Sequence, residues 1–93
     1  MQEAEARSIF VEFLAGKRRT HGYALAEVPG TARRLPGAWS FHYQATEFIE
    51  TGDMQAMLVG NGPVVLMDDG SILEGGSLDF SAEDVIRNRR PPR

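Results

Sequence analysis

Apolar residues recur at helical spacing near the start of the chain. They fall on one side of a helix while charged residues take much of the other side: Ile9, Phe10, Phe13 and Leu14. We therefore predict an amphipathic helix over residues 2–15. Gly16 follows the last apolar position, where glycine commonly ends a helix, and the three basic residues after it suit the negative end of the helix dipole.

The middle of the chain alternates between apolar and polar residues. This period of two predicts a strand over residues 38–45, with three aromatic residues on one face and Ser40, His42 and Gln44 on the other. Residues 21–28 predict an earlier strand. Prolines and glycines at both ends of residues 29–37 predict a loop between the two strands.

Residues 46–60 are less regular. Phe48 and Ile49 fit either an extension of the preceding strand or the start of a turn. Asp53 is a good N-cap, and the apolar residues after it share one face of a short helix. We predict this helix over residues 54–59, with Gly60 as its left-handed stop.

Residues 59–77 contain five glycines, which raises the question whether they bind a phosphate or only turn the chain. In a phosphate-binding loop the glycines follow a strand and lead into a helix, so that backbone N–H groups point at the anion. Here Gly62 precedes Pro63, which has no N–H, and an apolar run typical of a buried strand follows. We therefore assign these glycines to bends of the backbone and expect no cofactor.

A hairpin and a helix complete the predicted elements. Asp69-Gly70 favours a tight turn joining strands over residues 64–67 and 71–74. Ser81 is a natural N-cap for a helix over residues 82–88, and Phe80 is placed to meet Val85 as a hydrophobic staple. We expect residues 88–93 to form a frayed basic tail.

These elements indicate a single α+β domain over residues 1–93. We expect a small antiparallel sheet of about four strands, with the N- and C-terminal helices packed on one face. The absence of cysteine excludes disulfides and thiolate zinc sites. Because the longest apolar run is only about five residues, we expect neither a signal peptide nor a membrane span, and hence a cytoplasmic protein with no membrane partner.

Charge is distributed unevenly along the chain. Every lysine and arginine lies in residues 1–34 or 87–93, whereas residues 35–86 carry nine carboxylates and no basic residue. Nucleic-acid binding requires a basic stripe to neutralise phosphates, so this distribution argues against a nucleic-acid partner.

The sequence offers few groups for catalysis. It has two histidines, and no serine occupies the strand-to-helix elbow typical of a nucleophile. We interpret His42 as a solvated or partner-facing side chain. The acidic turn at residues 68–71 lacks the alternating oxygen ligands and the distal glutamate of a calcium loop. We therefore expect a protein that is not an enzyme and has no metal site.

An ordered set of segments resembles a known family. The segments are "AWSFHYQATEFIETGD", "LVGNGP", "DDGSI" and "GGS", and together they are similar to the bacterial immunity protein 35 family over residues 38–77. The resemblance implies an α+β domain without known catalytic residues. It also implies an antidote that binds a toxin of a polymorphic-toxin system, or, as in one branch of the family, a chaperone-like heat-stable protein.

The antidote interpretation agrees with the charge distribution, because an acidic surface can steer a basic effector domain. We therefore predict a partner-binding surface with His42 nearby, formed by Glu47, Glu50, Asp53, Asp68 and Asp69. The alternative is that arginines from both ends of the chain fold back and neutralise these acids. The sheet edge near residues 22–28 also leaves room for a homodimer.

Overall fold

The computed structural model describes residues 1–89, and it begins with a helix longer than predicted. Helix α1 spans Glu3–His21 and ends at Gly22, which adopts a left-handed conformation (φ 84°) and donates its N–H to the Arg18 carbonyl at 2.7 Å. Gly16 lies inside the helix. The residues that follow it are good helix formers, so nothing local stops the helix there. The predicted strand over residues 21–28 shrinks to β1, Leu25–Glu27.

Six strands form two antiparallel sheets. The larger has the order β2-β3-β5-β6 and the smaller pairs β1 with β4. Their bounds are β2 Arg33–Leu35, β3 Ala38–Phe41, β4 Tyr43–Ala45, β5 Asn61–Met67 and β6 Ile72–Gly76. The strand predicted over residues 38–45 is interrupted at His42, so β3 belongs to the large sheet and β4 to the small one. The predicted loop over residues 29–37 contains β2, which forms a hairpin with β3.

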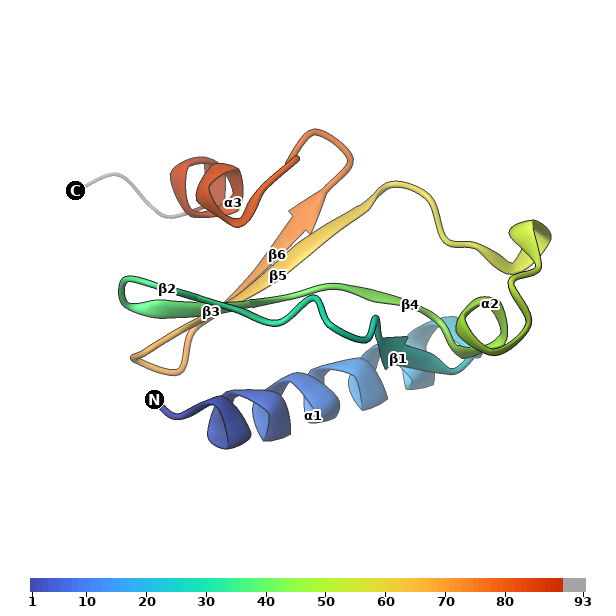
Figure 1. Cartoon of the computed structure of the whole chain (residues 1–93), viewed down its shortest axis with the longest axis horizontal. Helices are drawn as coiled ribbons and strands as arrows, with labels where there is room; N and C mark the ends of the chain where they lie inside the picture. The colour runs from blue at the N-terminus through green and yellow to red at the C-terminus, as the bar shows by residue number, and fades with distance from the viewer. Residues whose placement is uncertain (90–93) are drawn as a thin grey trace.

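The α+β class and the four-stranded antiparallel sheet are confirmed, but the two terminal helices cover opposite faces of the sheet rather than one (Figure 1). Val64 and Leu66 of β5 pack in one buried cluster with residues of α1, whereas Val65 packs in the other with residues of α3, Ala82–Arg89. Side chains alternate along a strand, so the continuous apolar run of β5 supplies both cores.

The core between α1 and the sheet contains a stacked pair of aromatic rings. The rings of Phe10 and Phe41 stack with their centroids 4.7 Å apart, and both side chains are fully buried. The Trp39 indole N–H donates to the Met1 carbonyl oxygen at 3.0 Å, which ties the start of α1 to β3.

Residues 46–60 form two short helices. Phe48 and Ile49 lie in α2, Thr46–Thr51, and therefore belong neither to the strand nor to a turn. The Asp53 carboxylate accepts the Gln55 N–H at 2.9 Å, so the predicted cap is confirmed. The helix it caps is only the 3₁₀ turn η1, Met54–Ala56, shorter than the predicted 54–59.

Two glycines, one on β5 and one on β6, permit a close approach of these two strands. A Cβ atom on Gly62 would lie 2.7 Å from the Gly76 carbonyl oxygen, and one on Gly75 would lie 2.6 Å from that of Pro63. The pairing of β5 with β6 shifts register in this region. Gly70 has a φ of 92° and turns the predicted hairpin. These glycines therefore shape the backbone, as expected from the sequence.

The entry to α3 confirms one local prediction and contradicts another. The Ser81 hydroxyl accepts the Asp84 N–H at 3.2 Å and caps the helix. The staple is wrong, because Phe80 is 85% exposed and Val85 packs instead in the buried cluster on the α3 face. Of the predicted tail, residues 88 and 89 belong to α3, and residues 90–93 lie outside the described residues.

Candidate functional site

The predicted acidic surface is divided between opposite ends of the molecule. Asp68 and Asp69 lie at the β5–β6 turn, whereas Glu47, Glu50 and Asp53 lie on α2 and just before η1. Figure 1 places these two regions near opposite ends of the longest dimension, which is 41 Å. The five carboxylates therefore do not form one surface.

Basic groups neutralise Asp68 at the β5–β6 turn. The Arg34 guanidinium donates to both carboxylate oxygens of Asp68 at 3.0 Å, and the N-terminal amino group lies 3.5 Å from the same carboxylate. The hydrogen bond from Arg34 lowers the pKa of Asp68 below its ordinary value, with its charge adding to the effect. Asp69 accepts the Ser71 N–H at 2.8 Å and shapes the turn.

Other acids are also neutralised by arginine or lysine. Arg33 pairs with Glu83, Lys17 with Glu74, and Arg87 with Asp84. The alternative that arginines fold back onto the predicted acids therefore holds for Asp68. Lys17 and Arg33 make similar long-range pairs with acids outside that set.

The remaining three predicted acids keep a different environment. The side chains of Glu47, Glu50 and Asp53 are exposed, and no ion pair among the described side chains involves them. Exposed apolar side chains accompany them: Tyr23 is 47% exposed, Met54 69% and Met57 38%. We call these six residues the α2–η1 surface. Its apolar members could not be recognised from the sequence, because the methionines fit a buried helix face equally well.

A hollow of about 420 Å³ lies within this surface. Its lining includes Tyr23, Glu47, Gln55, Ala56, Met57 and Leu58. The Gln44 side chain fixes one wall by accepting the Leu58 N–H at 2.8 Å and donating to the Leu58 carbonyl at 3.1 Å. These two hydrogen bonds hold the irregular segment after η1 against β4, so the hollow has a defined wall.

His42 belongs to neither acidic group. It lies on the α3 side of the sheet, where Arg33, Ser40 and Phe80 join it around a hollow of about 220 Å³. Partial desolvation of the ring and the nearby Arg33 charge lower the pKa of His42 below its ordinary value. The prediction that His42 stands near the acidic surface is therefore wrong. Strand β4 lies between His42 and α2 in the chain.

Within residues 1–89, no group of three His, Asp or Glu side chains is placed to hold a metal ion. In the same part of the chain, no helix has the length and apolar character needed to cross a bilayer.

The fold and its exposed groups define a small α+β domain that presents both acidic and apolar side chains at one end. The family model for immunity protein 35 matches residues 4–84, from the first turn of α1 into α3. The chain belongs to the immunity protein 35 family, as its sequence segments predicted.

One curated relative shares a shorter region with this chain. "Uncharacterized protein YrhB" of Escherichia coli (strain K12) is 45% identical over 36 residues, which cover 39% of this chain and 38% of YrhB. The chain thus aligns with much less than two thirds of that protein. No solved structure matches the chain.

Proposed function

We propose that this chain is an antidote that binds and neutralises a cognate toxin protein without performing chemistry of its own. The observation that carries the proposal is the immunity protein 35 match over residues 4–84, which includes nearly every element of the fold. An immunity protein must bind tightly and occlude its target, and a rigid domain loses little conformational entropy on binding. Two packed cores on either side of β5 provide such a domain.

Co-expression tests this function directly. The genes beside this one are sequenced first, and the C-terminal domain of a polymorphic toxin found there is the probe, expressed in a host that lacks the natural antidote. We expect the toxin alone to stop growth and the full chain to restore it, with a 1:1 complex in calorimetry. Growth arrest that persists at full expression of a folded chain, together with no heat of binding, would reject the antidote function. Turnover of the toxin by the chain would reject the non-enzymatic mechanism.

A chaperone-like function is the second candidate, and exposed apolar groups support it. Leu78 and Phe80 are 80% and 85% exposed, and binding of non-native chains requires accessible apolar surface. The purified chain would then suppress the aggregation of heat-denatured citrate synthase, and Phe80→Ser would weaken the suppression. An antidote that acts on one toxin leaves citrate synthase aggregation unchanged.

A further inference from the structure

The α2–η1 surface combines two kinds of group that protein interfaces use together. It has an exposed aromatic ring and exposed methionine side chains, both of which are enriched at interface cores. It also carries the exposed carboxylates of Glu47, Glu50 and Asp53, of which Glu47 lines the hollow itself. The 420 Å³ hollow offers a partner side chain a recess in which it would lose contact with water.

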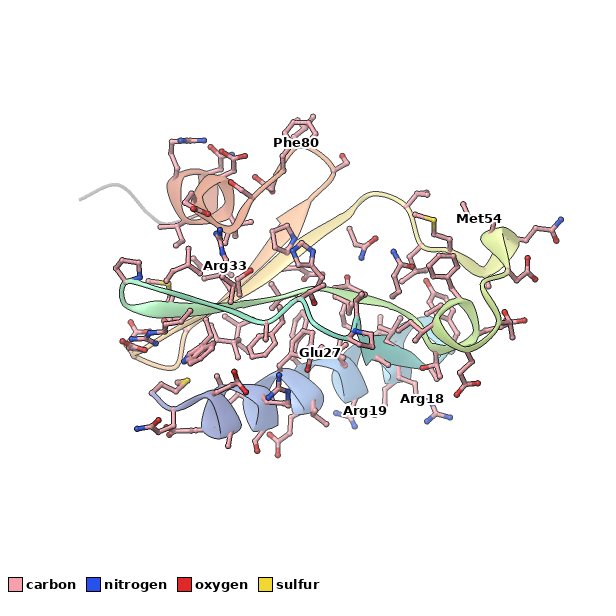
Figure 2. All side chains as sticks on the ribbon, in the orientation of Figure 1. Arg18, Arg19, Glu27, Arg33, Met54 and Phe80 are labelled. Atoms are coloured by element: carbon pink, nitrogen blue, oxygen red, sulfur yellow. The ribbon has the colours of Figure 1, made fainter. Side chains whose placement is uncertain are left out.

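Charge complementarity specifies the occupant of this surface. No lysine or arginine occurs between Leu35 and Ile86, so the charged side chains of α2 and of Asp53, just before η1, are all negative. Lys17 of α1 lines an adjoining hollow with Tyr23 and Leu58, but its ammonium group pairs with Glu74. Arg18 and Arg19 follow it on the last turns of α1. Figure 2 shows both pointing away from the side on which Met54 lies. A partner with basic side chains thus gains favourable contacts here and meets no positive counterpart on α2 or η1.

The competing exposed patch lacks this selectivity. Figure 2 shows Phe80 projecting from the loop before α3, on a different part of the molecule from Met54. The ionic groups around that loop are mixed, because Arg33 pairs with Glu83 and Arg87 with Asp84. Nothing about this patch favours a partner of one charge.

We propose that the α2–η1 surface is the docking face for the toxin, and that it fits a partner surface where basic side chains surround one protruding apolar side chain. This inference rests on the proposed antidote function and specifies its partner. The apolar side chain enters the hollow beside Tyr23 and Met57. The basic side chains contact Glu47, Glu50 and Asp53.

Charge reversal with a matched control tests the acidic residues of the α2–η1 surface. Glu47→Lys/Glu50→Lys should slow association with the toxin domain about 10-fold or more at low ionic strength and flatten the salt dependence. The control is Glu5→Lys/Glu12→Lys, which changes the net charge equally. Glu5, like Glu47, lies in the first turn of its helix, and both control residues are exposed on α1. Equal slowing by the two variants would overturn the proposal, since only net charge would then matter.

The hollow is tested by comparing two exposed apolar residues. We expect Met57→Ser to weaken the Kd for the toxin domain about 10-fold, as for an interface hot spot, and Phe80→Ser to leave it unchanged. The reverse result would move the docking face to the loop before α3 and overturn the proposal. Thermal unfolding of each variant verifies that the fold is retained.

A third measurement separates failure of the surface from failure of the antidote function. Chemical shifts of the isotope-labelled full chain are recorded with a synthetic pentapeptide that has one phenylalanine between two pairs of lysines. We expect changes confined to residues 46–58 and Tyr23, and their loss in Glu47→Lys/Glu50→Lys. Shifts elsewhere, or none, overturn the surface. If the peptide binds as expected but the toxin does not bind the wild-type chain, the antidote function fails while the surface stands for a basic partner.

Discussion

The two ends of the molecule carry the same kind of acidic residue in opposite circumstances. At the β5–β6 turn, Asp68 holds Arg34 in a two-point hydrogen bond and the guanidinium of Arg34 lies 5.6 Å from the Trp39 ring centre. At the α2–η1 end, Glu47 and Glu50 extend from a helix with no buried residues. Neighbours in the fold, and not the acidic residues themselves, thus decide which carboxylates stabilise the domain and which can meet a partner.

The ends also differ in packing. The sheet half is layered, with α1 and α3 on either side of β5 and two buried clusters between them. The α2–η1 end has neither of its short helices buried. Stability therefore resides in the first region, which leaves the second available to change its surface without loss of the fold.

Truncation of Phe10, in the layered half of the molecule, should have the largest effect on stability. Phe10→Ala removes a fully buried ring stacked on Phe41, and we expect the free energy of unfolding to fall by about 3–5 kcal/mol. Met54→Ala at the other end should change it by less than about 0.5 kcal/mol, because Met54 is largely exposed. Urea unfolding measures both. Similar losses for the two variants would show that the α2–η1 end shares the core.

Adding a methyl group where β5 and β6 approach closely should have a smaller effect on stability. A Cβ on Gly75 would lie 2.6 Å from the Pro63 oxygen and 2.8 Å from a Val85 methyl, so we expect Gly75→Ala to cost about 1–3 kcal/mol. Gly16→Ala is the control, because its Cβ meets only the end of Arg19 at 3.8 Å and alanine favours a helix interior by about 1 kcal/mol. We expect opposite signs in thermal unfolding. A neutral Gly75→Ala would show that the strands can separate without loss of packing.

The smallest effect concerns the paired acid and its pH dependence. The folded-state pKa of Asp68 is lowered, so its stabilisation is present above the unfolded value of about 3.9 and is lost as pH falls through the folded value. Asp68→Asn should therefore lower the Tm slightly at pH 7, and the deficit should shrink as the pH falls below about 3.9. Glu50→Gln is the control at pH 7, where we expect little change in Tm because the side chain is exposed. A Tm deficit for Asp68→Asn that persists at low pH would assign its role to shape rather than charge.

Local signals in the sequence predicted several elements correctly. The Asp69-Gly70 turn, the Ser81 cap and the Asp53 cap each depend on groups within three residues of one another. Such groups meet whatever the rest of the chain does, because a turn or cap requires only nearby backbone. The errors at Gly16 and Phe80 arose where two local outcomes were both compatible with the sequence, and helix continuation or long-range packing selected one of them.

By itself the sequence determined the α+β class, the amphipathic first helix, the continuous apolar run of strand β5 and the segregation of acidic residues into the middle of the chain. Only the tertiary structure decided that α1 and α3 cover opposite faces, that Arg34 reaches Asp68 across 34 positions, and that Glu47 lines one hollow with Tyr23. The physical reason is distance along the chain. Charge and periodicity can be read from neighbouring residues in the sequence. Whether a charged side chain has a partner depends on how the whole backbone folds, because the partner can come from a distant part of the chain.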